Sequence, residues 1–145
     1  MLKGLFILGK EPYEKIYGPE EREDIAKLVD IYAPPQTHES IKENPAILKD
    51  AEVIFSGWGA PRMDEEFLAL APNLKAVFYG AGSIKYMVTD AFWDRGIIVT
   101  SAYAANGIPV AEFTISQILF SLKRGWQFAL SIKKEGRYPT VKEEV

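Results

Sequence analysis

The chain has 145 residues, of which 48% are hydrophobic, so it is long and apolar enough to fold as a globular domain with a sizeable core. Its formal net charge is −3 and it has no basic run interleaved with aromatic residues, so we expect no nucleic-acid partner. Cysteine is absent, which excludes disulfides, thiolate metal sites and cysteine nucleophiles, and we expect no metal site. The amino terminus lacks a signal segment and the longest helix candidate carries charges, so we expect a cytoplasmic protein without a membrane partner.

The first third of the chain alternates strand and helix patterns. Short apolar runs at residues 2–8 and 29–33 predict buried strands, and charges interleaved with apolar residues predict an amphipathic helix at residues 20–29. Residues 40–43 have the spacing of a capping box, but Pro45 limits any helix that begins there. We therefore expect only a short or broken helix in this region.

The same alternation continues through the middle of the chain. Three further strands are predicted, at residues 51–56, 74–79 and 97–100. Asp64 and Thr89 are the predicted N-caps of helices at residues 65–71 and 90–94, and Gly96 is predicted to end the second helix. Because strands and helices alternate throughout, the sequence predicts an α/β fold with a parallel sheet of about five strands and helices on both faces.

The last predicted element is a long helix. Pro109 suits a first helical position, and the pattern continues to Lys133 with Gly125 as the only later glycine or proline within it. Such a helix would be roughly 37 Å long at 1.5 Å per residue. Its apolar residues fall on several faces, so we expect a second subunit or a missing domain to cover it, with packing against its own sheet as the alternative.

A glycine turn, Gly80-Ala81-Gly82-Ser83, follows the central strand. Its two glycines permit a positive φ and a close approach to the backbone, so its amide N–H groups could point at an anion, although a plain tight turn is the alternative. Lys85 occupies the third glycine position of a dinucleotide fingerprint, and no acidic residue follows about twenty positions later. We therefore expect a small anion such as a carboxylate.

Three loops are expected to converge on one edge of the sheet. Residues 57–61, 80–83 and 101–108 each follow a predicted strand. Open parallel sheets bind ligands beyond the carboxyl ends of their strands, so this edge is the predicted binding site.

Residues 73–139 resemble the D-isomer-specific 2-hydroxyacid dehydrogenase family. In that family a strand, a glycine turn, a short helix and a G-I-x-V strand lead into a V-A-E helix, in this order and at similar spacing. The motifs that carry the resemblance are Pro72-Asn73-Leu74-Lys75, Gly80-Ala81-Gly82, Val88-Thr89-Asp90, Arg95-Gly96-Ile97-Ile98-Val99 and Val110-Ala111-Glu112. The resemblance implies a flavodoxin-like three-layer substrate-binding domain at residues 1–103, followed at residues 104–145 by the hinge and first long dimerisation helix of an otherwise missing NAD(P)-binding domain.

The same resemblance implies the residues of the site. The turn Gly80, Ala81, Gly82 and Ser83 would receive the substrate carboxylate through the amides around Ala81 and Gly82. Trp58 and Gly59 would form another wall, and Asn106 would lie near the substrate. The family's catalytic arginine, glutamate and histidine follow the long helix, so no catalytic residue is expected in this chain, and its cofactor-binding residues are unknown.

Three other residues invite a functional interpretation that the pattern does not favour. His38, the only histidine, matches no catalytic position and is interpreted as a solvated loop residue. Arg62 could reach an anion near Trp58, but a lone surface arginine is more often solvated. Glu112 is interpreted as interacting with the amino terminus of its own helix.

The implied function is the substrate-binding part of an NAD(P)-dependent D-2-hydroxyacid dehydrogenase, which transfers hydride between a nicotinamide and a 2-oxo or 2-hydroxy acid. The parent protein would use NAD or NADP, whereas this chain alone is expected to be inactive, to bind no cofactor and to form a homodimer through the helix from Pro109 to Lys133. The alternative is a stand-alone flavodoxin-like ligand-binding or assembly module without catalysis, whose cofactor by fold analogy would be a flavin. A receiver module is disfavoured because Ser56-Gly57-Trp58 stands where its phospho-accepting aspartate would be.

Overall fold

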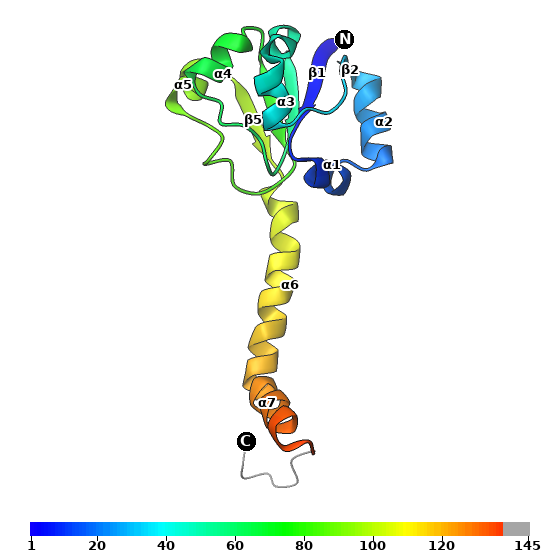
Figure 1. Cartoon of the computed structure of the whole chain (residues 1–145), viewed down its shortest axis with the longest axis vertical. Coiled ribbons are helices and arrows are strands. Elements are labelled where there is room, and N and C mark those ends of the chain that lie inside the picture. Colours follow the sequence, from blue (N-terminus) through cyan, green and yellow to red (C-terminus); the bar gives the residue numbers. More distant parts are fainter. Residues whose placement is uncertain (138–145) are drawn as a thin grey trace. The chain divides into compact units, whose positions relative to one another are not determined.

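A computed structural model describes residues 1–137 of the chain. The residues divide into two units, Met1–Ala104 and Ala105–Val145. The elements, shown in Figure 1, are β1 (Leu2–Ile7), α1 (Lys10–Ile16), α2 (Pro19–Leu28), β2 (Val29–Ile31), α3 (His38–Glu43), the 3₁₀-helix η1 (Pro45–Asp50), β3 (Val53–Ser56), α4 (Glu65–Leu70), β4 (Ala76–Tyr79), α5 (Asp90–Asp94), β5 (Ile98–Ser101), α6 (Tyr103–Leu122) and α7 (Gly125–Glu135).

The first unit contains one five-stranded sheet in the order β2-β1-β3-β4-β5, and every neighbouring pair is parallel. Strands next to each other in space but not in sequence require crossover connections, which the helices supply. This is the strand order of the flavodoxin-like doubly wound fold. The predicted α/β fold with five parallel strands is therefore confirmed.

Alternation along the strands divides the core into two layers. Leu5 and Ile54 lie in the layer that also holds α3, η1, α4 and α5, whereas Phe6 and Phe55 lie in the layer formed with α1 and α2. Because successive side chains of a strand point to opposite faces, a continuous apolar run serves both layers. The helices on the two faces are labelled in Figure 1.

The predicted caps of two helices are confirmed, and a third cap lies elsewhere. The side chain of Asp64 accepts a hydrogen bond from the Phe67 amide, and that of Thr89 accepts one from the Phe92 amide. The capping box belongs to Thr37 rather than to residues 40–43, because the Thr37 and Ser40 side chains each accept a hydrogen bond from the other's backbone N–H. Single capping side chains therefore located these helix starts better than the box motif did.

The sequence-based prediction did not include α1. This helix follows Gly9 directly, and Tyr13 and Ile16 pack against the same core layer as Phe6. Tyr13, Ile16 and Tyr17 have the spacing of three and four residues that marks a helix face, and this was the signal available in the sequence.

The second unit corrects the prediction of one uninterrupted helix that begins at Pro109. α6 already begins at Tyr103, and Pro109 lies inside it. Because Pro109 is near the start of the helix, its missing N–H removes only one early hydrogen bond. The helix ends at Leu122, where Arg124 takes a left-handed conformation with φ of 54°, and α7 then begins.

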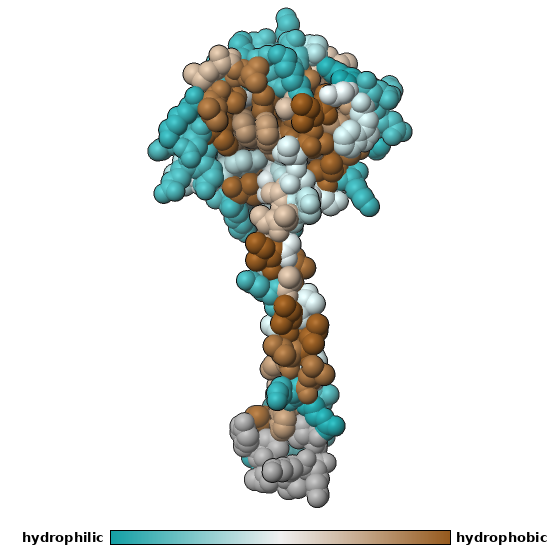
Figure 2. Space-filling model, turned by 180° about the vertical axis from the view of Figure 1, so that it is seen from behind, coloured by the Kyte–Doolittle hydropathy of each residue, from teal (hydrophilic) through white to brown (hydrophobic). Residues whose placement is uncertain are grey.

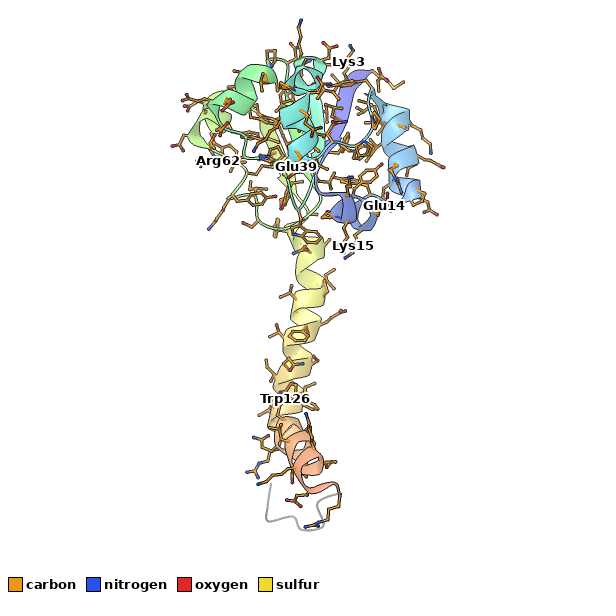
Figure 3. The ribbon with its side chains drawn as sticks, in the orientation of Figure 1. Lys3, Glu14, Lys15, Glu39, Arg62 and Trp126 are labelled. Carbon is orange, nitrogen blue, oxygen red and sulfur yellow. The ribbon has the colours of Figure 1, made fainter. Side chains whose placement is uncertain are left out.

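The junction of α6 and α7 is packed by aromatic rings. The rings of Phe120 and Trp126 meet edge to face with centroids 5.1 Å apart, and the Phe120 ring occupies the space that a side chain at Gly125 would need. Glycine at this position therefore permits the ring to close over the turn. Figure 3 labels Trp126 at the start of α7.

Large apolar side chains are exposed along both helices of the second unit. They are Ile108, Val110, Phe113, Ile115, Ile118, Leu119, Phe120, Leu122, Trp126 and Leu130. Figure 2 shows their apolar surface. None of the helices that the structure describes is long and apolar enough to cross a membrane.

Candidate functional site

The carboxyl ends of four strands lie side by side. Ile7, Ser56, Tyr79 and Ser101 are successive neighbours in register across β1, β3, β4 and β5. The segments that follow these strands therefore start at one edge of the sheet, and the predicted loops at residues 57–61 and 80–83 are two of them. The predicted loop at residues 101–108 is wrong, because β5 ends at Ser101 and α6 begins at Tyr103. The chain leaves β1 toward the layer of α1 and leaves β3 toward the layer of α4, so the ends of β1 and β3 form the topological switch point where such folds bind ligands.

The loops after β1 and β3 touch through two glycines. The Gly9 amide donates a hydrogen bond to the Trp58 carbonyl oxygen at 2.9 Å. Gly59 has a φ of +83°, and a Cβ atom there would lie 2.9 Å from the Gly9 nitrogen, so only glycine fits without strain. The turn leaves Trp58 46% exposed in the loop that follows β3.

Two tyrosines connect the loop after β3 to the segment after β4. The Tyr86 hydroxyl donates to the Gly57 carbonyl oxygen at 3.1 Å, so at 3.0 Å it accepts the hydrogen bond that the Tyr79 hydroxyl donates. Burial, and then the hydrogen bond with Tyr86, raise the pKa of the Tyr79 phenol above its usual range. The Tyr79 phenol therefore stays protonated at neutral pH, and the two hydrogen bonds hold the two segments together.

The turn after β4 is shaped by packing rather than by a left-handed backbone. Positive φ among the described glycines is confined to Gly59, Gly96 and Gly136, so Gly80 and Gly82 do not use the freedom that the sequence suggested. A side chain at Gly80 would instead collide with Ile16 of α1. The Gly80 amide donates to the Ser56 carbonyl oxygen at 2.8 Å, which fixes the start of the turn.

The accessible amides of this turn belong to Gly82 and Ser83. Ala81 is fully buried, whereas Gly82 is half-buried and Ser83 is exposed. Within residues 1–137, neither the Gly82 nor the Ser83 backbone N–H has an acceptor. The Ser101 hydroxyl reaches the carbonyl oxygens of Ala81 and Gly82 at 3.0 and 2.5 Å. The turn thus offers two adjacent N–H donors, which suit an oxyanion.

The residues of this turn do not fit a dinucleotide. A pyrophosphate site needs a helix that begins directly after the glycine turn, but α5 begins only at Asp90. Lys85 again replaces the third glycine. Within the described part of the chain, no group of three histidine or acidic side chains could hold a metal ion.

Two of the remaining candidates lie away from the turn. His38 is the first residue of α3 rather than a loop residue and is only partly exposed, which corrects the sequence-based interpretation. His38 and the exposed Arg62 line a hollow of about 580 Å³ between α3 and α4, whose apolar floor includes Phe67. Figure 3 shows Arg62 on the side of the unit that carries α4 and α5.

The other two candidates belong to α6. Asn106 lies in its first turns, within the second unit, so its place near a substrate stays a prediction. Glu112 stands ten positions into the 20-residue helix counted from Tyr103, so it cannot interact with the helix amino terminus as expected. The earlier start of α6 is the reason for this correction.

Comparison with known proteins connects this fold to two dehydrogenases. The sequence matches no family profile and no curated protein. The structure is similar to D-lactate dehydrogenase from Aquifex aeolicus, solved with NAD and lactic acid, with a TM-score of 0.65 and 25% identity over 97% of this chain and 40% of that chain. It also has the fold of NAD-dependent formate dehydrogenase from Staphylococcus aureus, solved with NAD, with a TM-score of 0.64 and 21% identity over 94% of this chain and 42% of that chain.

The two comparisons agree on the extent of the likeness. Almost all of this chain is covered, whereas it spans only about two fifths of the length of either dehydrogenase. The resemblance of this chain to the D-isomer-specific 2-hydroxyacid dehydrogenase family, first suggested by its ordered sequence motifs, is therefore confirmed by its structure.

Proposed function

We propose that the first unit is the substrate-binding part of an NAD(P)-dependent D-2-hydroxyacid dehydrogenase and that it binds a 2-oxo or 2-hydroxy acid at its carboxyl edge. The observation that carries the proposal is the likeness to D-lactate dehydrogenase over 97% of this chain. The start of the loops after β1, β3 and β4 at one edge, beside the end of β5, supports it. The domains at residues 1–103 and 104–145 would then be the substrate-binding domain and the start of the coenzyme domain.

The proposed binding mode follows from the donors at the edge. The substrate carboxylate accepts hydrogen bonds from the Gly82 and Ser83 amides, because charge-assisted hydrogen bonds to a carboxylate are stronger than neutral ones. Trp58 supplies an apolar wall in the neighbouring loop. Fixing the carboxylate at two points fixes the direction of C2, which is what a hydride transfer requires.

The chemistry belongs to the parent protein in this proposal. NAD or NADP supplies the hydride there, and the described residues of this chain contribute substrate binding alone. The only histidine of the chain, His38, begins α3 and lines the hollow between α3 and α4, so no histidine of the Gly80 turn or of the loop of Trp58 could take up the hydroxyl proton. We therefore expect this chain to be inactive by itself.

Two measurements test this proposal together. Isothermal titration or NMR should detect saturable binding of pyruvate or D-lactate to the chain. When the chain is mixed with pyruvate and NADH, the absorbance of NADH at 340 nm should stay constant. Absence of binding for every 2-oxo and 2-hydroxy acid tried would contradict the proposed site. Turnover by the chain would contradict the proposal that this chain binds the substrate without catalysing the reaction.

We also propose that α6 and α7 form a homodimer. Exposed apolar side chains such as Phe113 and Ile118 would be costly to leave in water, and a second copy offers an identical apolar surface. Analytical ultracentrifugation should give a dimer for the wild type and a monomer for the double variant Phe113→Asp, Ile118→Asp. The matched control is Ser116→Asp, which lies one helical turn after Glu112 and outside the arc between Phe113 and Ile118. Equal masses for wild type and double variant would contradict this interface.

The alternative is a stand-alone ligand-binding or assembly module without catalysis. The observation behind it is that the described residues by themselves form a five-stranded sheet with the flavodoxin-like strand order. An absorbance scan of the purified chain separates the two, because a flavin band near 450 nm would support the module and remove the case for a carboxylate at this edge.

A further inference from the structure

Ser101 is the last residue of β5 and lies beside the Gly80 turn, twenty residues away in sequence. Its hydroxyl oxygen is 3.0 Å from the Ala81 carbonyl oxygen and 2.5 Å from the Gly82 carbonyl oxygen. A hydroxyl carries one proton and can share it between two nearby acceptors. A single side chain therefore holds two consecutive peptide groups of the turn.

The orientation of these carbonyls decides where the next amides point. In a planar trans peptide, the C=O of one residue and the N–H of the following residue point in opposite directions. Holding the Ala81 carbonyl toward β5 therefore turns the Gly82 N–H away from β5. Holding the Gly82 carbonyl does the same for the Ser83 N–H.

Burial and hydrogen bonding agree with this geometry. The two outward N–H groups have no acceptor within residues 1–137, and their residues are the accessible part of the turn. Val99, two residues before Ser101, packs against the core layer of α3 to α5, so Ser101 shares its face of the sheet. Thr100 points to the opposite face and cannot replace it.

We infer that Ser101 is the positioning residue of the anion site, because its hydroxyl sets two adjacent peptide planes so that the Gly82 and Ser83 amides face a bound carboxylate together. The inference rests on the proposed function and specifies it. The Ser101 hydroxyl orients both N–H donors before the ligand binds. Binding then costs less conformational entropy, because the turn is already ordered. Ser101 itself does not touch the ligand.

The test compares two variants of nearly equal shape. Ser101→Thr keeps the hydroxyl, whereas Ser101→Val replaces it by a methyl group. The ¹⁵N-labelled chain is titrated with sodium pyruvate in chloride-free buffer, and the Gly82 and Ser83 amide signals are followed by NMR. Wild type and Ser101→Thr should show saturable downfield shifts with similar affinity, and Ser101→Val should bind roughly three- to ten-fold more weakly, the effect of losing about one hydrogen bond.

A readout without ligand separates ordering from binding. The heteronuclear NOE of the Gly82 and Ser83 amides should fall in Ser101→Val and stay at the wild-type value in Ser101→Thr. Thr100→Val is the matched control, since it removes a hydroxyl from the other face of the same strand and should change neither readout. Pyruvamide, which lacks the carboxylate, should leave the two amides unshifted.

The outcomes distinguish the role of Ser101 from the proposed carboxylate site. Equal pyruvate affinity in Ser101→Thr and Ser101→Val would overturn the role of Ser101 and leave the proposed site standing. If the wild-type amides do not shift with pyruvate, or shift equally with pyruvamide, the proposed carboxylate site is wrong and the inference falls with it. A drop in the NOE of Ser101→Thr equal to that of Ser101→Val would show that bulk, not the hydroxyl, orders the turn.

Discussion

The two faces of the sheet are covered to different extents within the first unit. On one face, Val77 of the central strand β4 is fully buried under α3, η1, α4 and α5. On the other, Phe78 of the same strand is 40% exposed and Ile98 of β5 is 65% exposed. The connection from β1 to β2 supplies α1 and α2 to that second face, and right-handed crossovers send the remaining connections to the first. Burial here therefore depends on chain topology more than on residue type.

The largest difference between the faces should appear in a pair of phenylalanine truncations. Phe92 of α5 is fully buried in the covered layer, so Phe92→Ala should lower the free energy of unfolding by about 3–5 kcal/mol. Phe78 lies on the part of the second face that α1 and α2 leave uncovered, which we call the open half. Phe78→Ala should cost only about 1–2 kcal/mol, because the ring already contacts water on one side. Urea denaturation followed by circular dichroism measures both. Equal losses would mean that the open half is covered in solution.

A smaller effect is expected at Tyr17, which lies between the covered and the open half of the second face. The Tyr17 hydroxyl donates to the Ser56 carbonyl oxygen of β3 at 2.8 Å and lies 3.2 Å from the Phe78 carbonyl oxygen of β4. Tyr17→Phe removes this hydroxyl, so both carbonyl oxygens lose it as a hydrogen-bond donor. We expect a loss of about 1–2 kcal/mol in the free energy of unfolding. Tyr13→Phe is the control, because its hydroxyl only meets the Arg22 side chain near the surface, and it should change stability by less than about 0.5 kcal/mol.

Alkaline pH provides a more gradual probe of the covered face. The Tyr32 hydroxyl donates to the Ile47 carbonyl oxygen at 2.6 Å, and burial, with a smaller contribution from Asp50, raises the pKa of Tyr32 from 10.0 to about 12. Below pH 10 the phenol is protonated in both the folded and unfolded chain, so its stabilising contribution is complete. Between pH 10 and 12 only the unfolded chain releases the proton, so stability falls as the pH rises.

The measurement is the urea midpoint as a function of pH. Tyr32→Phe should show a shallower decline across this window than the wild type does. Parallel curves for the two proteins would mean that Tyr32 is not responsible.

The smallest effect is expected on the open half itself. Ile98→Thr keeps a β-branched side chain that suits a strand, and its new hydroxyl stays in contact with water. The free energy of unfolding should therefore change by no more than about 0.5 kcal/mol. Val99 is the next residue and lies on the covered face. Val99→Thr should cost clearly more, because it places a hydroxyl where a methyl group of Val99 packs against the core. Denaturation of the two variants side by side decides this, and a large loss for Ile98→Thr would contradict the open face.

The fold was predictable from local patterns, with errors where distant contacts decide. Apolar runs and caps such as Asp64 and Thr89 located the strands and two helices, because these signals act within a few residues. The start of the long helix was misplaced at Pro109, since proline is tolerated early in a helix as well as at its first position. At the break, Gly125 was noted as the one glycine of the predicted helix, but the left-handed residue is its neighbour Arg124, which no propensity singles out.

The candidate site was only half predictable. The glycine turn at residues 80–83 and the loop of Trp58 were recognisable because glycine and the end of a strand are local features. Tyr86 and Ser101 were not recognised, since Gly57 lies 29 residues from Tyr86 and Ala81 lies 20 residues from Ser101, and the sheet brings these segments together. The accessible amides also proved to be those of Gly82 and Ser83, because Ala81 is buried.

By itself, the sequence determined the alternation of strands and helices, the parallel sheet and the position of the glycine turn, because periodicity, caps and breakers operate over a few residues. The tertiary structure alone decided which face of β4 and β5 is left uncovered, and that one hydroxyl on β5 orients two peptide groups after β4. Both depend on the order and register of strands that are neighbours in space but far apart in the chain.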